Sequence, residues 1–341
     1  MPTVPADRLL AISRRIFEAA GTPGDLAEVV SDHLINANLA GHDSHGVIRI
    51  PSYVQTIQRG QLDPAARPRT LEDRGATIRV DGNWAFGQVA ARYAIELAIA
   101  RAKELGVALV GIVHANHIGR VGEYPSIAAE RGVAAFVTVG GLGKSVAPHG
   151  GRRGGLGTNP ISFGFPAADH PPLLVDFATS SIAGGKVMVA RAKGEPVPPG
   201  SLIDANGQPT QDANEYFAGG ALLPFGGHKG YGLSLVSALF SGVLTQAAHA
   251  EGERGGGGVL MLAIDAGAFG PAERAIADAD AVMERIKAIP PAAGVAEVLV
   301  PGEPEARSRQ RRGQEGVPVP EATWREIDQT ARSMGVHLDA T

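Results

Sequence analysis

Gly41–Tyr53, GHDSHGVIRIPSY, places two histidines, an aspartate, two serines, an arginine and a tyrosine at the junction of two predicted helices. Apolar residues at helical spacing precede it, and Gly41 can end that helix in the left-handed conformation that other residues avoid. Pro51 suits the first turn of the next helix because its missing N–H needs no partner there. The stretch has no apolar periodicity of its own, so we expect its polar side chains to face a cleft.

Two residues in this stretch suit chemistry on a small organic acid. His45 can donate or accept a proton near neutral pH. Arg49 carries a planar guanidinium that fits a carboxylate with two hydrogen bonds. A proton-transferring group beside a carboxylate-binding group is what a reaction at C2 of a 2-oxo or 2-hydroxy acid requires. The plainer alternative is that both residues act only as helix caps or ion-pair partners.

Metal binding and hydrolysis are further interpretations of the same stretch. His42, Asp43 and His45 would supply three ligands from four successive residues, which converge poorly on one ion, so we expect no metal. The side chains of Asp43, Ser44 and His45 diverge as neighbours, whereas a catalytic triad is defined in space. A cofactor-independent binding or hydrolytic protein that uses these histidines is the rival class.

The composition indicates an ordinary globular protein. Hydrophobic residues make up 44% of 341 residues, enough for a substantial core and two interleaved lobes. The formal net charge of -4 argues against a nucleic-acid partner, which normally requires a basic excess. The chain has no cysteine, which excludes disulfides and thiolate chemistry. We find no signal peptide and no membrane-length apolar run, and therefore expect a cytoplasmic protein without a membrane partner.

The hydropathy pattern alternates between helical and strand-like segments, which indicates an α/β protein. Predicted helices cover residues 6–20, 25–40, 88–104, 124–131, 233–244, 272–288 and 321–334. Predicted strands cover residues 76–80, 107–113, 133–139, 161–165, 173–177, 259–264 and 298–300. Loops are predicted over residues 61–75, 140–143, 191–220 and 252–258. No G-x-G-x-x-G lies between a strand and a helix, which argues against a standard dinucleotide-binding fold.

A second glycine-rich stretch, Gly226–Gly232, is typical of a phosphate or pyrophosphate site. Glycines allow close approach of a ligand, a helix start presents free N–H groups, and His228 and Lys229 add positive charge. The alternative is a tight helix entry with a solvated lysine. Gly140–Gly143, after a predicted strand, can also bring amides to a phosphate or form a plain turn.

Three more polar residues follow buried strands. His114 and His117 have a three-residue spacing that suits a metal, but no further ligands are apparent, and one of them more simply faces the cleft. Asp176 ends a strand and can accept hydrogen bonds from a ribose or a nicotinamide amide, or cap the next helix.

Six ordered motifs together resemble the malate/L-lactate dehydrogenase family, which is unrelated to the classical lactate dehydrogenases. They are Ser44-His-Gly46 with Arg49, Pro51 and Tyr53; His117-Ile-Gly-Arg-Val121 with Gly122 and Tyr124; Gly157-Thr-Asn-Pro160; Asp176-Phe-Ala-Thr-Ser180; Gly226-Gly-His-Lys-Gly-Tyr-Gly-Leu233; and Pro301-Gly-Glu303. The resemblance covers nearly the whole chain. It implies a non-Rossmann NAD(P)-binding α/β fold, with a largely antiparallel sheet, flanking helices and a helical lobe from the chain termini.

The resemblance also implies roles for single residues. The catalytic set is Ser44, His45, Arg49 and His117. The substrate-binding set is Arg49, Tyr53, Thr158, Gly184 and Gly185. The cofactor-binding set is His117, Ile118, Gly119, Arg120, Val121, Gly140, Asp176, Phe177, Ala178, His228, Lys229, Pro301, Gly302 and Glu303, and residues 301–307 would lie at the cofactor's far end. Whether His45 or His117 transfers the proton stays open.

By the same resemblance, the activity is that of an NAD- or NADP-dependent dehydrogenase of a small malate- or lactate-like acid. The alternative is an NADPH-dependent reductase of cyclic imino acids. The implied division is a helical lobe of residues 1–75 and 305–341, for substrate binding and dimerisation, and a cofactor-binding and catalytic region of residues 76–304.

A homodimer is expected for two reasons. The family that the chain resembles is usually dimeric, and the two N-terminal helices carry apolar stripes that a small lobe leaves partly uncovered. The alternative is that both stripes pack against the chain's own C-terminal helix, residues 321–334.

Overall fold

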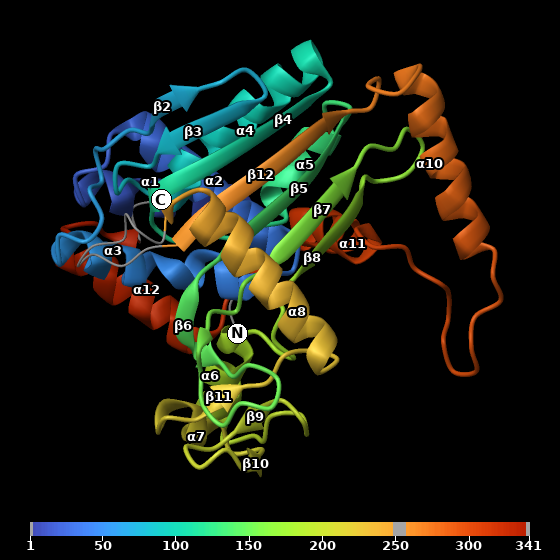
Figure 1. Ribbon diagram of the computed structural model, residues 1–341. Coiled ribbons are helices and arrows are strands. Elements are labelled where there is room, and N and C mark those ends of the chain that lie inside the picture. Colours follow the sequence, from blue (N-terminus) through green and yellow to red (C-terminus); the bar gives the residue numbers. More distant parts are fainter. Residues whose placement is uncertain (1–2, 248–256, 339–341) are drawn as a thin grey trace.

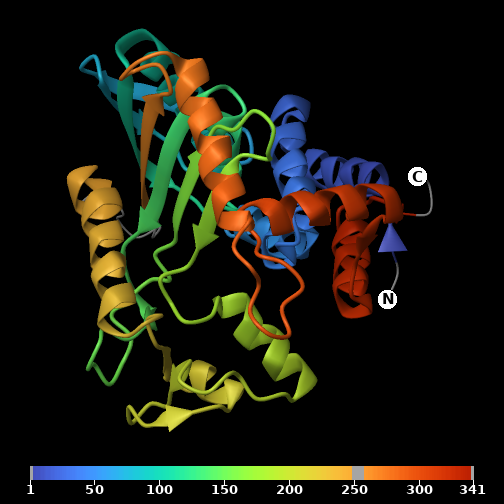
Figure 2. The ribbon, with the colours of Figure 1, turned by 90° about the vertical axis from the view of Figure 1, so that its right-hand side faces the viewer.

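The computed structural model describes residues 3–247 and 257–338, and it contains a central sheet, a helical lobe and a small lobe (Figures 1 and 2). The sheet has the order β2-β3-β4-β12-β5-β7-β8. Only β3 and β4 pair in parallel, and every other pair of neighbours in this sheet is antiparallel. The bounds are β2 Arg69–Asp73, β3 Thr77–Asp81, β4 Val107–Ala115, β5 Val133–Gly140, β7 Ile161–Phe165, β8 Leu173–Phe177 and β12 Gly257–Asp265. This arrangement confirms the predicted largely antiparallel α/β fold.

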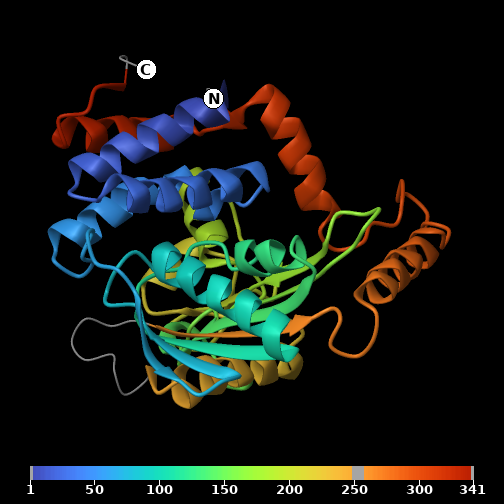
Figure 3. The ribbon, with the colours of Figure 1, turned by 90° about the horizontal axis from the view of Figure 1, so that it is seen from above.

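Helices cover both faces of the sheet (Figure 3). One face carries α4 (Gly87–Leu105) and α5 (Glu123–Ala129), which bury alanine and β-branched side chains against β4, β5 and β12. The other face carries α8 (His228–Ser237), which continues as the π-helix η3 (Ala238–Leu244). A long helix, α10 (Ala272–Lys287), follows β12 and buries only Asp280 and Met283.

Helix α8 and η3 approach the sheet closely because small residues face each other. A Cβ on Gly140 would lie 2.7 Å from Ser237 Oγ, and one on Gly258 would lie 1.5 Å from the Ser241 carbonyl oxygen. Ser237 Oγ donates to the Val139 carbonyl at 3.0 Å. The inner face is therefore small and polar, and the apolar side chains of this helix point away from the sheet.

The helical lobe combines both ends of the described chain. It contains α1 (Ala6–Ala19), α2 (Gly24–Leu39), α3 (Ile50–Gln58), α11 (Glu303–Glu315) and α12 (Glu321–Ser333), and the short strands β1 (Thr3–Val4) and β13 (Val317–Pro318) pair within it. The apolar stripe of α1 packs in one core with Ile327 and Ala331 of α12. Leu9, Ile12 and Ile16 are each at most 1% exposed. The expectation that the N-terminal stripes lie uncovered is wrong, because α1, α2 and α12 bury their apolar side chains in one core of the same chain.

The small lobe corrects two loop predictions. Residues 140–143 do not form only a loop, because β6 (Leu142–Val146) begins there. Residues 191–220 are not a plain surface excursion, since they hold β9 (Leu202–Ile203), β10 (Pro209–Thr210) and α7 (Ala213–Phe217). With β11 (Ala221–Leu222) and α6 (Gly184–Lys193) they form a separate core around Leu202 and Leu222. We predicted a loop because residues 191–220 include many prolines, glycines and aspartates, which are typical of loops.

Most of the other predicted helices and strands agree with the structure. The sequence predicted none of α6, β1, β11 and β13, and further differences are as follows. Residues 61–75 include β2, an edge strand whose side chains are all exposed and therefore show no alternation. Residues 298–300 form no strand, and α11 was not predicted because its sequence has almost no apolar residue. Residues 252–256 of the predicted loop lie outside the described residues, whereas Gly257 and Gly258 open β12. The domain limits at 75/76 and 304/305 stay a prediction. No helix among the described residues is long and apolar enough to cross a membrane.

Candidate functional site

The stretch Gly41–Tyr53 forms a compact turn between α2 and α3. Gly41 adopts a φ of +87° after α2, as predicted for a helix end. Two short 3-10 helices follow, η1 (Asp43–His45) and η2 (Val47–Arg49), before α3 begins with Pro51 in its first turn. A Cβ on Gly46 would lie 2.1 Å from Asn38 Oδ1, so the turn requires glycine there.

Polar contacts from α2 and α11 hold this turn. The side chain of Asn38 accepts a hydrogen bond from the Val47 N–H at 2.8 Å and donates to Asp43 Oδ1 at 2.6 Å. Arg312 of α11 binds both oxygens of Asp43, at 2.6 and 3.0 Å, and donates to the Asn38 carbonyl oxygen at 2.6 Å. Asp43, Asn38 and Arg312 therefore fix the backbone that carries Ser44 and His45.

The structure brings His45 and His117 together. Their rings stack with centroids 5.6 Å apart and an interplanar angle of 13°. Ser44 Oγ lies 3.0 Å from His45 Nδ1, and Tyr53 Oη lies 2.7 Å from His117 Nδ1. The pairing of Ser44 with His45 is therefore a geometric fact, and Tyr53 belongs to the neighbourhood of His117. The Nε2 atom of His117 makes no hydrogen bond to a residue that the structure describes.

Burial and positive charge keep these imidazoles neutral. Burial lowers the pKa of His45 to about 4, and the Arg49 guanidinium adds to the effect. The same two causes hold the pKa of His117 well below its usual value. His117 retains an exposed surface, which reduces the size of that shift but not its direction. Burial raises the pKa of Tyr53 to about 12, so its phenol stays protonated.

One nitrogen of the Arg49 guanidinium is used in a hydrogen bond within the turn. Its Nε donates to the Ser44 carbonyl oxygen at 2.6 Å. Neither terminal amino group makes a hydrogen bond to any part of the chain that the structure describes. One edge of the guanidinium is thus available for a carboxylate, beside the two histidines.

A second polar cluster lies next to this site, around Arg120. Its side chain is 2% exposed, and its Nε and Nη2 atoms lack hydrogen-bond partners. The nearest carboxylate is Asp176, whose Oδ2 lies 3.5 Å from Nε and accepts the Gly122 N–H at 3.0 Å. Burial raises the pKa of Asp176, while Arg120 opposes that effect. His33 Nε2 accepts the Arg120 N–H at 2.8 Å, and burial lowers the pKa of His33 to about 3.

The other predicted cofactor residues lie on several different elements. Ile118, Gly119 and Val121 are buried, and Gly119, with φ +77°, leaves room for the His33 ring. At the start of α8, Gly226 and Gly227 have positive φ angles, and His228 and Lys229 are exposed. Phe177 and Ala178 follow Asp176 at the end of β8 and are half-buried.

Pro301–Glu303 packs on the start of β8. The Leu174 N–H donates to the Pro301 carbonyl at 3.1 Å, and Gly302 has a φ of +102°. Both carboxylate oxygens of Glu303 have partners within the chain, the Lys287 ammonium and the Val300 N–H. His42 of the turn lies 3.3 Å from Glu305 and lowers the pKa of that carboxyl.

The remaining predicted residues lie at other positions. Thr158 accepts two hydrogen bonds from Thr179 through its carbonyl oxygen, and no contact with the histidine pair is found. Gly140 serves helix packing, as described above. Gly184 and Gly185 start α6, and a Cβ on Gly185 would lie 2.9 Å from Ser44 Cβ, so α6 begins directly against the turn.

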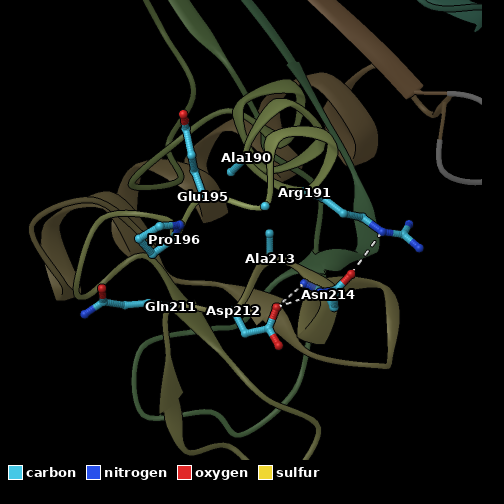
Figure 4. A pocket seen from close by; sticks show the side chains of 9 residues that line it. Ala190, Arg191, Glu195, Pro196, Gln211, Asp212, Ala213 and Asn214 are labelled. Atoms are coloured by element: carbon cyan, nitrogen blue, oxygen red, sulfur yellow. Dashed lines mark hydrogen bonds between the residues drawn. The ribbon is translucent and has the colours of Figure 1, made fainter.

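A cavity of about 340 Å³ opens between α6 and α7 of the small lobe (Figure 4). Arg191 reaches across it, with Nε 3.2 Å from Asn214 Oδ1, and Asp212 caps α7 (Figure 4). No predicted site residue lines this cavity. The chemistry-bearing side chains instead gather at the turn, and among the described residues no cluster suits a metal ion.

Sequence reasoning missed several residues that shape the site. Gln88 of α4 donates to Tyr53 Oη at 2.7 Å, and Asn38 and Arg312 hold the turn. Nothing in the sequence marks Gln88 or Arg312, because each meets its partner only in the folded chain. His33 left a signal, since it lies on the apolar face of α2 where a polar residue needs a partner.

Comparisons with known proteins agree on one family. The family model for malate/L-lactate dehydrogenases matches residues 4–328. Hydroxycarboxylate dehydrogenase B of Escherichia coli K12 is 39% identical, over 97% of this chain and 94% of that protein. A Delta(1)-pyrroline-2-carboxylate/Delta(1)-piperideine-2-carboxylate reductase of Pseudomonas putida is 35% identical, over 93% of this chain and 94% of that protein. The solved structure of sulfolactate dehydrogenase from Methanocaldococcus jannaschii aligns with a TM-score of 0.89 and 31% identity, covering 99% of both chains.

Proposed function

The chain belongs to the malate/L-lactate dehydrogenase family, and from this premise we propose a hydride transfer between a nicotinamide cofactor and C2 of a small 2-oxo or 2-hydroxy carboxylic acid. It is an oxidoreductase, as its dehydrogenase and reductase relatives are. The observation that carries the proposal is the stacking of His45 on His117, with Arg49 held to the neighbouring Ser44 carbonyl and its charge acting on both rings.

Arg49 binds the substrate carboxylate in this proposal. Its Nε is held by the Ser44 carbonyl, which orients the planar group, and its terminal amino groups remain for two parallel hydrogen bonds. A carboxylate bound there is near His45, because Arg49 is held to the carbonyl of the neighbouring Ser44, and His117 stacks on His45. The reacting carbon is the neighbour of the carboxylate, so the same contact brings it to the proton-transferring group.

We assign the proton transfer to His117 and a supporting role to the Ser44–His45 pair. His117 is exposed, and its Nδ1 already contacts the Tyr53 hydroxyl. In reduction, the Nε2 proton of His117 passes to the oxygen that forms on C2, and the phenol proton of Tyr53 passes to Nδ1. An alkoxide is a stronger base than a phenolate, so the transfer is favourable even with the Tyr53 pKa at about 12. Oxidation reverses both transfers.

The cluster around Arg120 fits a nicotinamide cofactor. A buried guanidinium with unpartnered Nε and Nη2 needs an acceptor, and a diphosphate supplies one. Asp176 is placed beside it, and Lys229 adds charge at the glycine-rich start of α8. When bound, the cofactor supplies or accepts the hydride. The residues proposed to hold it are His117–Val121, Gly140, Asp176–Ala178, His228, Lys229 and Pro301–Glu303; Tyr53, Thr158, Gly184 and Gly185 are proposed for the substrate.

A direct assay tests this function. Purified protein is mixed with NADH or NADPH and a panel of 2-oxo acids, and with NAD or NADP and the matching hydroxy acids. We expect turnover of at least one acid and a rate for His117→Gln that is lower by about 10²–10⁴-fold. Cyclic imino acids in the same panel test the activity named for the Pseudomonas relative. Absence of turnover with every pair would overturn the proposal, and the better of NAD and NADP defines the cofactor.

We further propose a homodimer formed through α8 and η3. Seven large apolar side chains there are between 36% and 62% exposed: Leu233, Leu235, Val236, Leu239, Phe240, Val243 and Leu244. Their inward neighbours are serines, so the helix is apolar on the side that faces away from its own sheet. Apolar patches of this kind are usually covered by another subunit, and a two-fold dimer is the commonest solution.

Light scattering tests the dimer. The wild-type mass should be about twice the 35.1 kDa of one chain, and Leu239→Glu should reduce it to one chain. Leu105→Glu, at an exposed leucine of α4, is the control. A wild-type mass of one chain with full activity would refute the proposal.

A further inference from the structure

Gln88 is a buried amide that contacts the phenol behind the catalytic histidine. It is the second residue of α4 and is 1% exposed. Its Nε2 donates to Tyr53 Oη at 2.7 Å, and that oxygen lies 2.7 Å from His117 Nδ1. The other end of the amide, Oε1, is buried without a hydrogen-bond partner. The three side chains form a single line of hydrogen bonds that ends at the ring of His117.

The number of protons on the three side chains decides which group donates and which accepts in each of these hydrogen bonds. A phenol has one proton to donate. If the Gln88 amide donates to Tyr53, the phenol proton is free to point at His117 Nδ1. Nδ1 then accepts, and a neutral imidazole must carry its proton on Nε2. If an acceptor stood in place of that amide N–H, the phenol would donate to it, and His117 would have to donate from Nδ1.

The backbone holds Gln88 where it can act. A Cβ on Gly87 would lie 2.3 Å from the Asn116 carbonyl oxygen and 2.4 Å from that of His117, so the start of α4 packs directly on the segment that carries the histidine. Tyr53 is buried from the other side, with its ring 6.1 Å from Phe86. Neither the amide nor the phenol can move away from the ring without disturbing this packing.

We propose that Gln88 is a positioning residue that fixes the Nε2–H tautomer of His117 through the Tyr53 hydroxyl. The inference rests on the proposed function, in which His117 Nε2 gives a proton to the oxygen on C2. The amide N–H has a second effect in the same step. When the phenol proton moves to Nδ1, the phenolate oxygen still accepts a hydrogen bond from Gln88, which stabilises the charge that forms there. Atoms and charge balance, since one proton leaves Nε2 and one arrives at Nδ1.

Nitrogen NMR of histidine-labelled protein tests the tautomer without cofactor or substrate. The His117 signals are identified by their loss in His117→Gln. In the wild type we expect a protonated Nε2 and an unprotonated Nδ1. In Gln88→Glu at alkaline pH, the carboxylate only accepts, so the tautomer should reverse. Gln55→Glu makes the same chemical change on an exposed part of α3, the helix that carries Tyr53, and should leave the signals unchanged.

Kinetics give the second readout. Gln88→Met removes the amide N–H with little change in side-chain length. It should lower kcat by about tenfold to a hundredfold with a KM changed less than threefold, because the carboxylate site at Arg49 is intact. An unchanged tautomer in Gln88→Glu, or an unchanged kcat in Gln88→Met, overturns the role of Gln88. If His117→Gln keeps full activity, the proposed proton transfer fails instead, so the two failures can be told apart.

Discussion

Replacing Arg312 with methionine should weaken both the fold and the active site, because this one side chain ties α11 to the turn at Gly41–Tyr53. The guanidinium donates to both Asp43 oxygens, at 2.6 and 3.0 Å, and to the Asn38 carbonyl oxygen at 2.6 Å. Its side chain is 12% exposed, whereas that of Asp43 is 45% exposed. The three contacts join residues more than 260 positions apart in the sequence.

The size of the loss follows from these exposures. A hydrogen bond to a charged group contributes about 1.5–3 kcal/mol when buried, and an exposed ion pair contributes about 1 kcal/mol or less. Water can replace part of what Asp43 loses, so we expect the free energy of unfolding to fall by about 2–3 kcal/mol rather than by the full sum. That is a decrease in Tm of roughly 3–4 °C for a chain of this size.

The assay compares thermal unfolding and steady-state kinetics of Arg312→Met with those of Arg311→Met. Arg311 is its exposed neighbour and makes no hydrogen bond or ion pair with the described part of the chain. Because Asp43 begins the turn that carries His45, kcat/KM should also fall by about tenfold or more, since small displacements of a reacting group are costly. Equal Tm and equal kcat/KM in the two variants would refute the reasoning.

Three further predictions concern charge. Arg49→Lys keeps the positive charge but loses the paired donors, so kcat/KM for the acid should fall by about tenfold or more while the Tm changes little; near-wild-type turnover would contradict it. Lys229→Ala should raise the Kd of the cofactor about tenfold or more, with Lys193→Ala as control, and an unchanged titration would show that Lys229 is only solvated. His33, with a pKa of about 3 when folded, takes up a proton near pH 6.5 only when unfolded, so stability should fall as the pH falls from 6.5 towards 3, by about 2 kcal/mol at pH 5. In His33→Gln, whose amide oxygen can accept the Arg120 N–H, the decline in Tm should be smaller; an equal decline would contradict the assignment.

The sequence predicted most of the sheet because its strands are buried and apolar. Val107–Val113 and Val133–Val139 form central strands as expected. The sequence did not predict the strands and helices of the small lobe, because they are short and have no long apolar run. They are stabilised by contacts with one another, such as the antiparallel pairing of β9 with β10 and β11. Helix α11 was not predicted because an arginine-rich surface helix has no apolar residues at helical spacing. The hydropathy pattern therefore predicts helices and strands that have an apolar face of their own. It does not predict those that are stabilised mainly by contacts with neighbouring elements.

The candidate site divides in the same way. Motif residues such as His45 and Arg49 could be singled out because their chemistry is local. Their partners could not, because Gln88 reaches Tyr53 across 35 positions and Arg312 reaches Asp43 across 269. The sequence also led us to expect the exposed apolar surface on the wrong helices. The stripe on α1 resembles an interface but is buried in the core of the helical lobe, whereas residues 233–244 were predicted only as a helix and carry the exposed apolar face.

In the proposed function, Arg49 connects substrate binding to the protonation of the two histidines. Its charge is the second cause, after burial, of the low pKa of both His45 and His117. A carboxylate that pairs with the guanidinium cancels that charge at the place where it acts, and so raises both pKa values. Neutral imidazoles do not repel one another in their stack. The filled site holds imidazoles that bind protons more readily, next to the carbon where an oxygen must be protonated. The Ser44 carbonyl holds the guanidinium within the same turn as His45, which keeps its charge close to the imidazole on which it acts.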